Sequence, residues 1–143
     1  MVPTIELMGY QELEKGLDDI IKYVKNPVKT MAEASMIMLQ NINRHFQNEE
    51  GPNGKWIGLL PLTILNRRNK GAIKILQDAG ELLISIKNAY TSTSAEAGTN
   101  KVYAPPHQYG FPKMNIPARK FAWLDDESQN RIVDRFIVGL KEA

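Results

Sequence analysis

The sequence contains no cysteine and only two histidines among its 143 residues. The lack of cysteine excludes thiol catalysis, thiolate zinc sites and disulfide scaffolds, and it favours a reducing compartment. No run approaches the roughly 18 uninterrupted apolar residues of a membrane helix, and the start of the chain lacks a basic region followed by an apolar stretch. We therefore expect a cytoplasmic, unprocessed protein without a membrane partner.

The sequence also lacks the common catalytic and nucleotide-binding motifs. GxxxxGK[ST], GxGxxG, GxSxG and HExxH do not occur. His45 lies beside Phe46, where a packed ring or a cation near a helix end explains it, and His107 lies in a distant turn. Two histidines so far apart, without a second ligand beside either, do not predict a metal site. We expect no catalytic residues, no cofactor and no metal.

Length and composition indicate one folded domain, residues 1–143. A single core commonly serves about 100 to 200 residues, and a chain of this size buries roughly two-thirds of its unfolded surface. Hydrophobic residues make up 43% of the chain and charged residues 24%, which argues against disorder.

Charge is distributed unevenly around a net value of +2. Residues 1–50 carry a net −3, residues 51–120 a net +7 and residues 121–143 a net −2. A basic middle between acidic ends indicates either a surface that faces a polyanion or copies that dock an acidic end onto the next copy's basic middle.

Apolar residues at steps of three and four predict three amphipathic helices. The first covers residues 10–25 and the second residues 28–46, with Asn26 and Pro27 between them. The third covers residues 126–141, with Asp125 before it and acidic residues in its first turn.

The part of the chain between these helices predicts a small antiparallel sheet built from residues 83–123. A hairpin is expected with strands at Leu83–Thr91 and Ser94–Gly98, and a third extended segment at Ile116–Leu124. Gln47–Lys55 is expected to be a loop and Tyr103–Gly110 a turn-rich connection. The expected fold class is α+β.

Asn66–Lys74 contains four cations in a polar stretch, Arg67, Arg68, Lys70 and Lys74. They would suit phosphates, but no interleaved aromatic residues accompany them, and a solvated loop explains them more simply. We expect this segment to order poorly in the free subunit and to dock on a carboxylate-rich protein surface in an assembly.

Several unusual segments occur in a fixed order along the chain. They are Phe46, GPNGKW at 51–56, Leu59, Thr63, ILQDAGELLISI at 75–86, YAPPHQYG at 103–110, IPARKF at 116–121 and the amphipathic C-terminal helix. This ordered set resembles the phage virion morphogenesis family, the tail-completion proteins of Mu-like prophages and related contractile-tailed phages. HQYG followed closely by IPAR and an aromatic residue carries most of the resemblance.

The resemblance implies a structural, non-enzymatic subunit that completes the tail or joins it to the head as a homo-oligomeric ring. Its implied partners are other tail or connector proteins, and its location is the host cytoplasm and then the virion. Two rival functions remain: a small basic nucleic-acid-binding accessory protein, with non-specific DNA contact, and a small hydrolase or toxin that uses His107.

The motif residues also have a physical interpretation as packing or interface groups. They are Trp56, Gly80, His107, Gln108, Gly110, Pro117, Arg119 and Phe121. Trp56 is expected to anchor the core or a subunit interface, and the two glycines to supply backbone freedom. Arg119 is expected either to form an ion pair within the subunit or to bind a neighbour's carboxylate or carbonyls, and we favour the first. Trp56, Leu82, Phe121 and Phe136 should be largely buried, in the subunit or at its interface.

Overall fold

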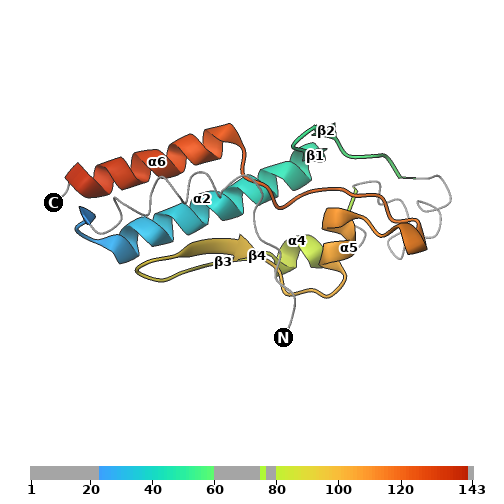
Figure 1. Cartoon of the computed structure of the whole chain (residues 1–143), viewed down its shortest axis with the longest axis horizontal. Coiled ribbons are helices and arrows are strands. Elements are labelled where there is room, and N and C mark those ends of the chain that lie inside the picture. Colours follow the sequence, from blue (N-terminus) through green and yellow to red (C-terminus); the bar gives the residue numbers. More distant parts are fainter. Residues whose placement is uncertain (1–22, 60–74, 77–79, 142–143) are drawn as a thin grey trace.

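A computed structural model describes residues 23–59, 75–76 and 80–141. Its long central helix, α2 (Pro27–Asn48), lies between the C-terminal helix α6 (Asp126–Lys141) on one side and a β-hairpin on the other (Figure 1). The hairpin consists of β3 (Lys87–Tyr90) and β4 (Ala95–Gly98), which pair antiparallel. The predicted α+β class is confirmed.

Helix α2 follows the predicted second helix and extends two residues beyond it. The Asn26 side chain accepts from the Lys29 backbone N–H at 3.3 Å, and Pro27 occupies the first turn, where its missing N–H costs nothing. The helix ends at Glu49, whose φ of 52° is left-handed. The predicted first helix, residues 10–25, lies outside the described residues except for its last three.

Helix α6 matches the predicted third helix. The Asp125 carboxylate accepts from the Ser128 backbone N–H at 2.8 Å, which caps the first turn. Ile132 and Phe136 point to the core one turn apart, whereas Ile137 is exposed. None of the helices that the structure describes is both long and apolar enough to cross a membrane.

The predicted hairpin is confirmed in pairing, but the start of its first strand is wrong. Leu83 begins no strand, because Glu81–Ser85 forms the short helix α4. Leu82 and Ile86 are buried while Ile84 is exposed, which is the spacing of a helix and not the alternation of a strand. Gly80, at a φ of 73°, admits the turn that starts this helix.

Two further predicted connections also contain regular structure. Within Gln47–Lys55, α2 continues to Asn48, and β1 (Glu50–Gly51) then pairs antiparallel with β2 (Gly54–Lys55) across a two-residue turn. The predicted turn at Tyr103–Gly110 is largely helix α5 (Ala104–Tyr109), because prolines are tolerated in a first helical turn. A single 3-10 turn, η2 (Pro112–Met114), follows.

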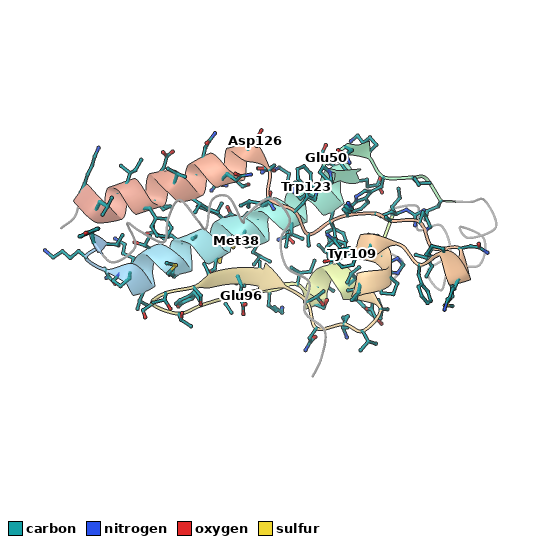
Figure 2. The ribbon with its side chains drawn as sticks, in the orientation of Figure 1. Met38, Glu50, Glu96, Tyr109, Trp123 and Asp126 are labelled. Carbon is teal, nitrogen blue, oxygen red and sulfur yellow. The ribbon has the colours of Figure 1, made fainter. Side chains whose placement is uncertain are left out.

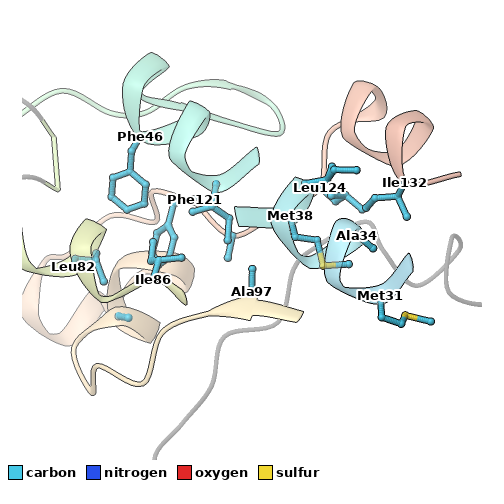
Figure 3. Packing of buried hydrophobic residues seen from close by; sticks show 14 of the residues in the cluster. Met31, Ala34, Met38, Phe46, Leu82, Ile86, Ala97, Phe121, Leu124 and Ile132 are labelled. Atoms are coloured by element: carbon cyan, nitrogen blue, oxygen red, sulfur yellow. The ribbon is translucent and has the colours of Figure 1, made fainter. Parts of the chain in front are cut away.

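The hydrophobic core runs along α2 and continues past its C-terminal end (Figure 3). The α2 side chains Met31, Met38, Ile42 and Phe46 are buried along its length. All four residues predicted to be buried are so, with exposed fractions of 7% for Trp56, 4% for Leu82, 0% for Phe121 and 2% for Phe136.

The predicted third strand, Ile116–Leu124, does not join the hairpin sheet. The structure pairs Ile116 with Phe111 in an isolated antiparallel bridge, and both described sheets are two-stranded. Residues 119–125, which we call the linker segment, pass from this bridge to the start of α6. Side chains bind the backbone of this segment where sheet neighbours were expected.

Candidate functional site

The motif residues converge on the linker segment, and Gln108 makes the most extensive contact with it. Gln108 lies on α5 and is fully buried. Its Nε2 donates to the Ala122 carbonyl at 2.9 Å, and its Oε1 accepts from the backbone N–H groups of Phe121 and Ala122, both at 3.0 Å. One side-chain amide therefore satisfies three buried backbone groups, as a neighbouring strand would.

Arg119 begins the linker segment and binds the chain just after Trp56. Its Nε donates to the Ile57 carbonyl at 2.8 Å and its Nη2 to the Gly58 carbonyl at 3.1 Å. Its backbone N–H donates to the His107 carbonyl at 2.7 Å. The expectation that Arg119 acts within the subunit is consistent with these contacts, although the bonds described here go to carbonyls and not to a carboxylate.

Trp56 anchors the other side of the linker segment. Its Nε1 donates to the Lys120 carbonyl at 2.9 Å. Its ring stands edge-on to Phe46, with centroids 5.6 Å apart, and Phe46 in turn contacts Phe121 at 5.2 Å. Of the two predicted roles for Trp56, core and interface anchor, the structure supports the first.

Two α2 side chains bind the end of the linker segment: Asn41, which sequence reasoning did not single out, and His45, which it interpreted as a packed ring or a cation near a helix end. Asn41 Nδ2 donates to the Trp123 carbonyl, and Asn41 Oδ1 accepts from the Asp125 backbone N–H at 3.2 Å. His45 Nε2 lies 3.2 Å from the same Trp123 carbonyl, and its ring stacks on the Trp123 indole at 3.9 Å. Their positions on the apolar face of α2, beside Met38 and Ile42, were the available signal.

An ion pair fixes the junction between the linker segment and α6. Arg44 Nη2 lies 2.6 Å from Asp125 Oδ2 and also donates to Ser128 Oγ at 3.0 Å. Burial opposes ionisation of Asp125, but hydrogen bonds from Ser128 and Arg44 outweigh it and lower the pKa of that carboxyl. The bond with Asp125 raises the pKa of Arg44, so both groups stay charged.

Gly110 ends α5 in a conformation that other residues rarely adopt. Its φ is 82° and its ψ 158°. A Cβ at this position would lie 3.1 Å from Ala118 N and 3.3 Å from the Ile116 carbonyl oxygen. Gly110 therefore supplies the predicted backbone freedom and also permits close approach to the half-buried stretch around Pro117.

The two histidines are packed groups in different places. Burial lowers the pKa of His45, and burial together with the Arg119 charge lowers the pKa of His107. The Nδ1 atom of each ring is buried and has no hydrogen-bond partner among the residues that the structure describes. His107 makes an edge contact with Tyr103 at 6.5 Å. Within the described ranges, no three His, Asp or Glu side chains gather as metal ligands would.

Other predicted residues do not belong to this cluster. Gly80 lies at the start of α4. Arg67, Arg68, Lys70 and Lys74 lie outside the described residues. A groove between α2 and α6 is lined by Ala32, Glu33, Met36, Ile37, Gln40, Arg131, Asp134 and Arg135, and no motif residue contributes to it.

Comparison with known families now places the chain. A model of the phage virion morphogenesis family matches residues 8–141, which is nearly the whole sequence. The chain belongs to the phage virion morphogenesis family. The match also covers the first predicted helix, which precedes the ordered motifs that begin at Phe46. No curated protein and no solved structure matches significantly.

Membership in this family assigns the chain a structural or assembly role in phage particles. Within this phage virion morphogenesis protein, the side chains of Gln108 in HQYG and Arg119 in IPAR bind the protein's own backbone. They make the linker segment a fixed element between α5 and α6.

Proposed function

We propose that this phage virion morphogenesis protein completes the tail or joins it to the head. It acts as a ring subunit, by self-assembly and docking, and has no enzyme activity. The observation that carries the proposal is the family match over residues 8–141. The geometry of the linker segment supports the proposal, because the side chains of Gln108 and Arg119 hydrogen-bond to backbone groups of the same chain and so have a structural role.

A subunit that works by docking must present its surfaces in a fixed relation to one another. The linker segment connects α5 to α6 through buried side-chain bonds on both sides, from Gln108 on α5 and Asn41 on α2. Such fully satisfied buried networks rigidify the chain around them. The partners are copies of this chain and connector or tail proteins. The protein binds them in the host cytoplasm during assembly and remains with them in the virion.

The basic stretch Asn66–Lys74 stays a prediction as a docking segment. Reversal of Arg67 and Arg68 to glutamate should leave the subunit folded and reduce assembly, whereas normal assembly at low and high salt would favour a solvated loop.

Deletion of the gene from an inducible prophage tests the proposed function. After induction we expect lysis, full heads and separate tails in electron micrographs, with few joined particles, and recovery when the unchanged chain is supplied in trans. A normal yield of infectious particles from the deletion strain would overturn the proposal. Steeply salt-dependent DNA binding by the purified protein, together with that normal yield, would favour the nucleic-acid-binding rival.

A further inference from the structure

The stretch around α5 and η2 exposes large apolar side chains that the core does not use. Val102 is 71% exposed, Met114 68% and Tyr109 58%, and Tyr103 and Phe111 are each more than one-third exposed. We call these five residues the aromatic face. All five lie within residues 102–114, and apolar residues that form one exposed patch, in contrast to single ones, mark a contact surface.

The backbone beneath the aromatic face is held in place. The Phe111 N–H donates to the Ile116 carbonyl at 2.8 Å, and the Ile116 N–H donates to the Phe111 carbonyl at 3.1 Å. The His107 carbonyl accepts from the Arg119 N–H at 2.7 Å. Binding at this face therefore needs little additional ordering of the chain, which lowers its entropic cost.

The same stretch has charge of one sign. From Gly98 to Leu124 the sequence carries four cations, Lys101, Lys113, Arg119 and Lys120, and no carboxylate. Arg119 is largely buried against backbone carbonyls, and Lys120 is half-buried in the linker segment. Lys101 and Lys113 are the cations that flank the aromatic face along the chain.

An acidic surface lies elsewhere on the same molecule. Asp126 and Glu127 are exposed in the first turn of α6, and Glu50 lies nearby on β1 (Figure 2). Glu127 Oε1 lies 3.7 Å from Arg44 Nη1, and Lys55 stands opposite Glu50 in the β1–β2 pair, so Asp126 is the carboxylate of this surface for which the structure describes no cation partner. The Trp123 Nε1 donates to the Glu50 carbonyl at 3.4 Å, which ties β1 to the chain just before α6. We call Glu50, Asp126 and Glu127 the acidic edge. In Figure 2, Glu50 and Asp126 lie along the upper side of the molecule, and Tyr109 lies below them.

We propose that the aromatic face of one copy docks on the acidic edge of a second copy. This inference rests on the proposed function and names the surfaces through which the ring forms. Two aromatic faces placed together would bring Lys101 and Lys113 against their own counterparts, which like-charge repulsion disfavours. A contact between two different surfaces repeats from copy to copy and closes into a ring. Duplex DNA is a poorer occupant, because its phosphate backbone provides no apolar surface on which Val102 and Met114 could be buried.

Charge reversal tests the pairing of the two surfaces in the deletion prophage. The variant K101E/K113E and the variant D126K should each lower the yield of infectious particles by about tenfold or more, since each places like charges in contact. Glu127 is left unchanged, because it lies 3.7 Å from Arg44 within the subunit. When the two variants are supplied together, the yield should recover. In a ring of alternating copies, the reversed face of one variant meets the reversed edge of the other, and the unchanged face meets the unchanged edge. K25E, an exposed cation on the approach to α2, is the matched control and should have no effect.

Removal of apolar area gives an independent arm. Y109S should reduce the yield, while Y90S, an exposed tyrosine of similar accessibility on the hairpin, should not. If neither charge variant changes the yield while deletion abolishes it, the docking surfaces are wrong and the proposed function stands. If the two reversed variants fail to rescue each other, the two surfaces do not meet.

The absence of cysteine allows a direct test on the purified chain and on isolated particles. The double variant M114C/D126C, treated with a short bis-maleimide, should give a ladder of dimers, trimers and higher oligomers, because each copy then joins two neighbours. M114C alone should give little product. Dimers from M114C alone would show that aromatic faces meet each other, and no ladder in either preparation would overturn the proposal.

Discussion

The side-chain amide of Gln108 is bonded to both backbone groups of Ala122: Nε2 donates to the carbonyl at 2.9 Å, and Oε1 accepts from the N–H at 3.0 Å. This pairing replaces the ladder that a sheet neighbour would provide. It shows how one side chain can satisfy the backbone of an extended stretch at Phe121 and Ala122.

Replacement of Gln108 by leucine should destabilise the protein strongly. Three backbone groups of Phe121 and Ala122 would lose their partner, and each unsatisfied buried group costs about 1 to 3 kcal/mol. We expect the free energy of unfolding in urea to fall by about 3 kcal/mol or more. Gln40→Leu, at an exposed position on α2, should change it by no more than about 0.5 kcal/mol. Equal effects in the two variants would contradict the assigned role of Gln108.

Two glycine substitutions should behave in opposite ways. Gly110→Ala places a side chain at a φ of 82° and within 3.1 Å of Ala118 N, so it should cost about 1 to 3 kcal/mol. Gly58→Ala meets open space and should be neutral or slightly stabilising, because alanine restricts the unfolded chain. Thermal denaturation of both variants checks this, and an unchanged midpoint for Gly110→Ala would show that the backbone relaxes there.

Arg119→Lys separates a structural role from an interface role. Lysine cannot reproduce the fork that binds the carbonyls of Ile57 and Gly58, so the free energy of unfolding should fall by about 1 to 3 kcal/mol. Arg131→Lys, at an exposed position on α6, is the control. If Arg119→Lys reduces assembly and leaves stability unchanged, the residue acts between subunits.

Phe136→Ala should cost about 3 to 5 kcal/mol, because Phe136 is 2% exposed in the core between α6 and α2. Its neighbour Ile137 is 42% exposed, and Ile137→Ala should have a much smaller effect. A denaturation midpoint that Phe136→Ala leaves unchanged would remove this residue from the core.

Stability should decline as the pH falls below neutral. Burial lowers the pKa of His45 and of His107 below the ordinary value of 6.5, so the unfolded chain binds protons that the native chain does not. Their contribution is complete above about pH 6.5 and is lost at up to about 1.4 kcal/mol per pH unit for each histidine as the pH falls below it. Unfolding at pH 7.5 and 5.5 measures the loss, and NMR titration of the two rings assigns it.

The pH dependence also has its own control. His45→Gln and His107→Gln should each flatten the slope between these two pH values, whatever their effect on absolute stability. Ring pKa values at or above 6.5 in the native protein would contradict the expectation.

The sequence by itself determined the elements whose signals are local. Apolar spacing and end residues such as Asn26 and Asp125 predicted α2 and α6 closely, since caps and helical periodicity involve only neighbouring residues. The ordered motifs also indicated the family that the full-length match confirms.

Tertiary structure alone decided how the linker segment is bonded. Ile116–Leu124 has the composition of a strand, but whether its backbone pairs with a strand or with side chains depends on which groups arrive from elsewhere. Asn41 reaches the Trp123 carbonyl from 82 residues away, and Gln108 reaches Ala122 from the end of a helix that the prolines had concealed. Local propensity carries no information about such distant partners, because a backbone group is satisfied equally well by an amide side chain or by a strand.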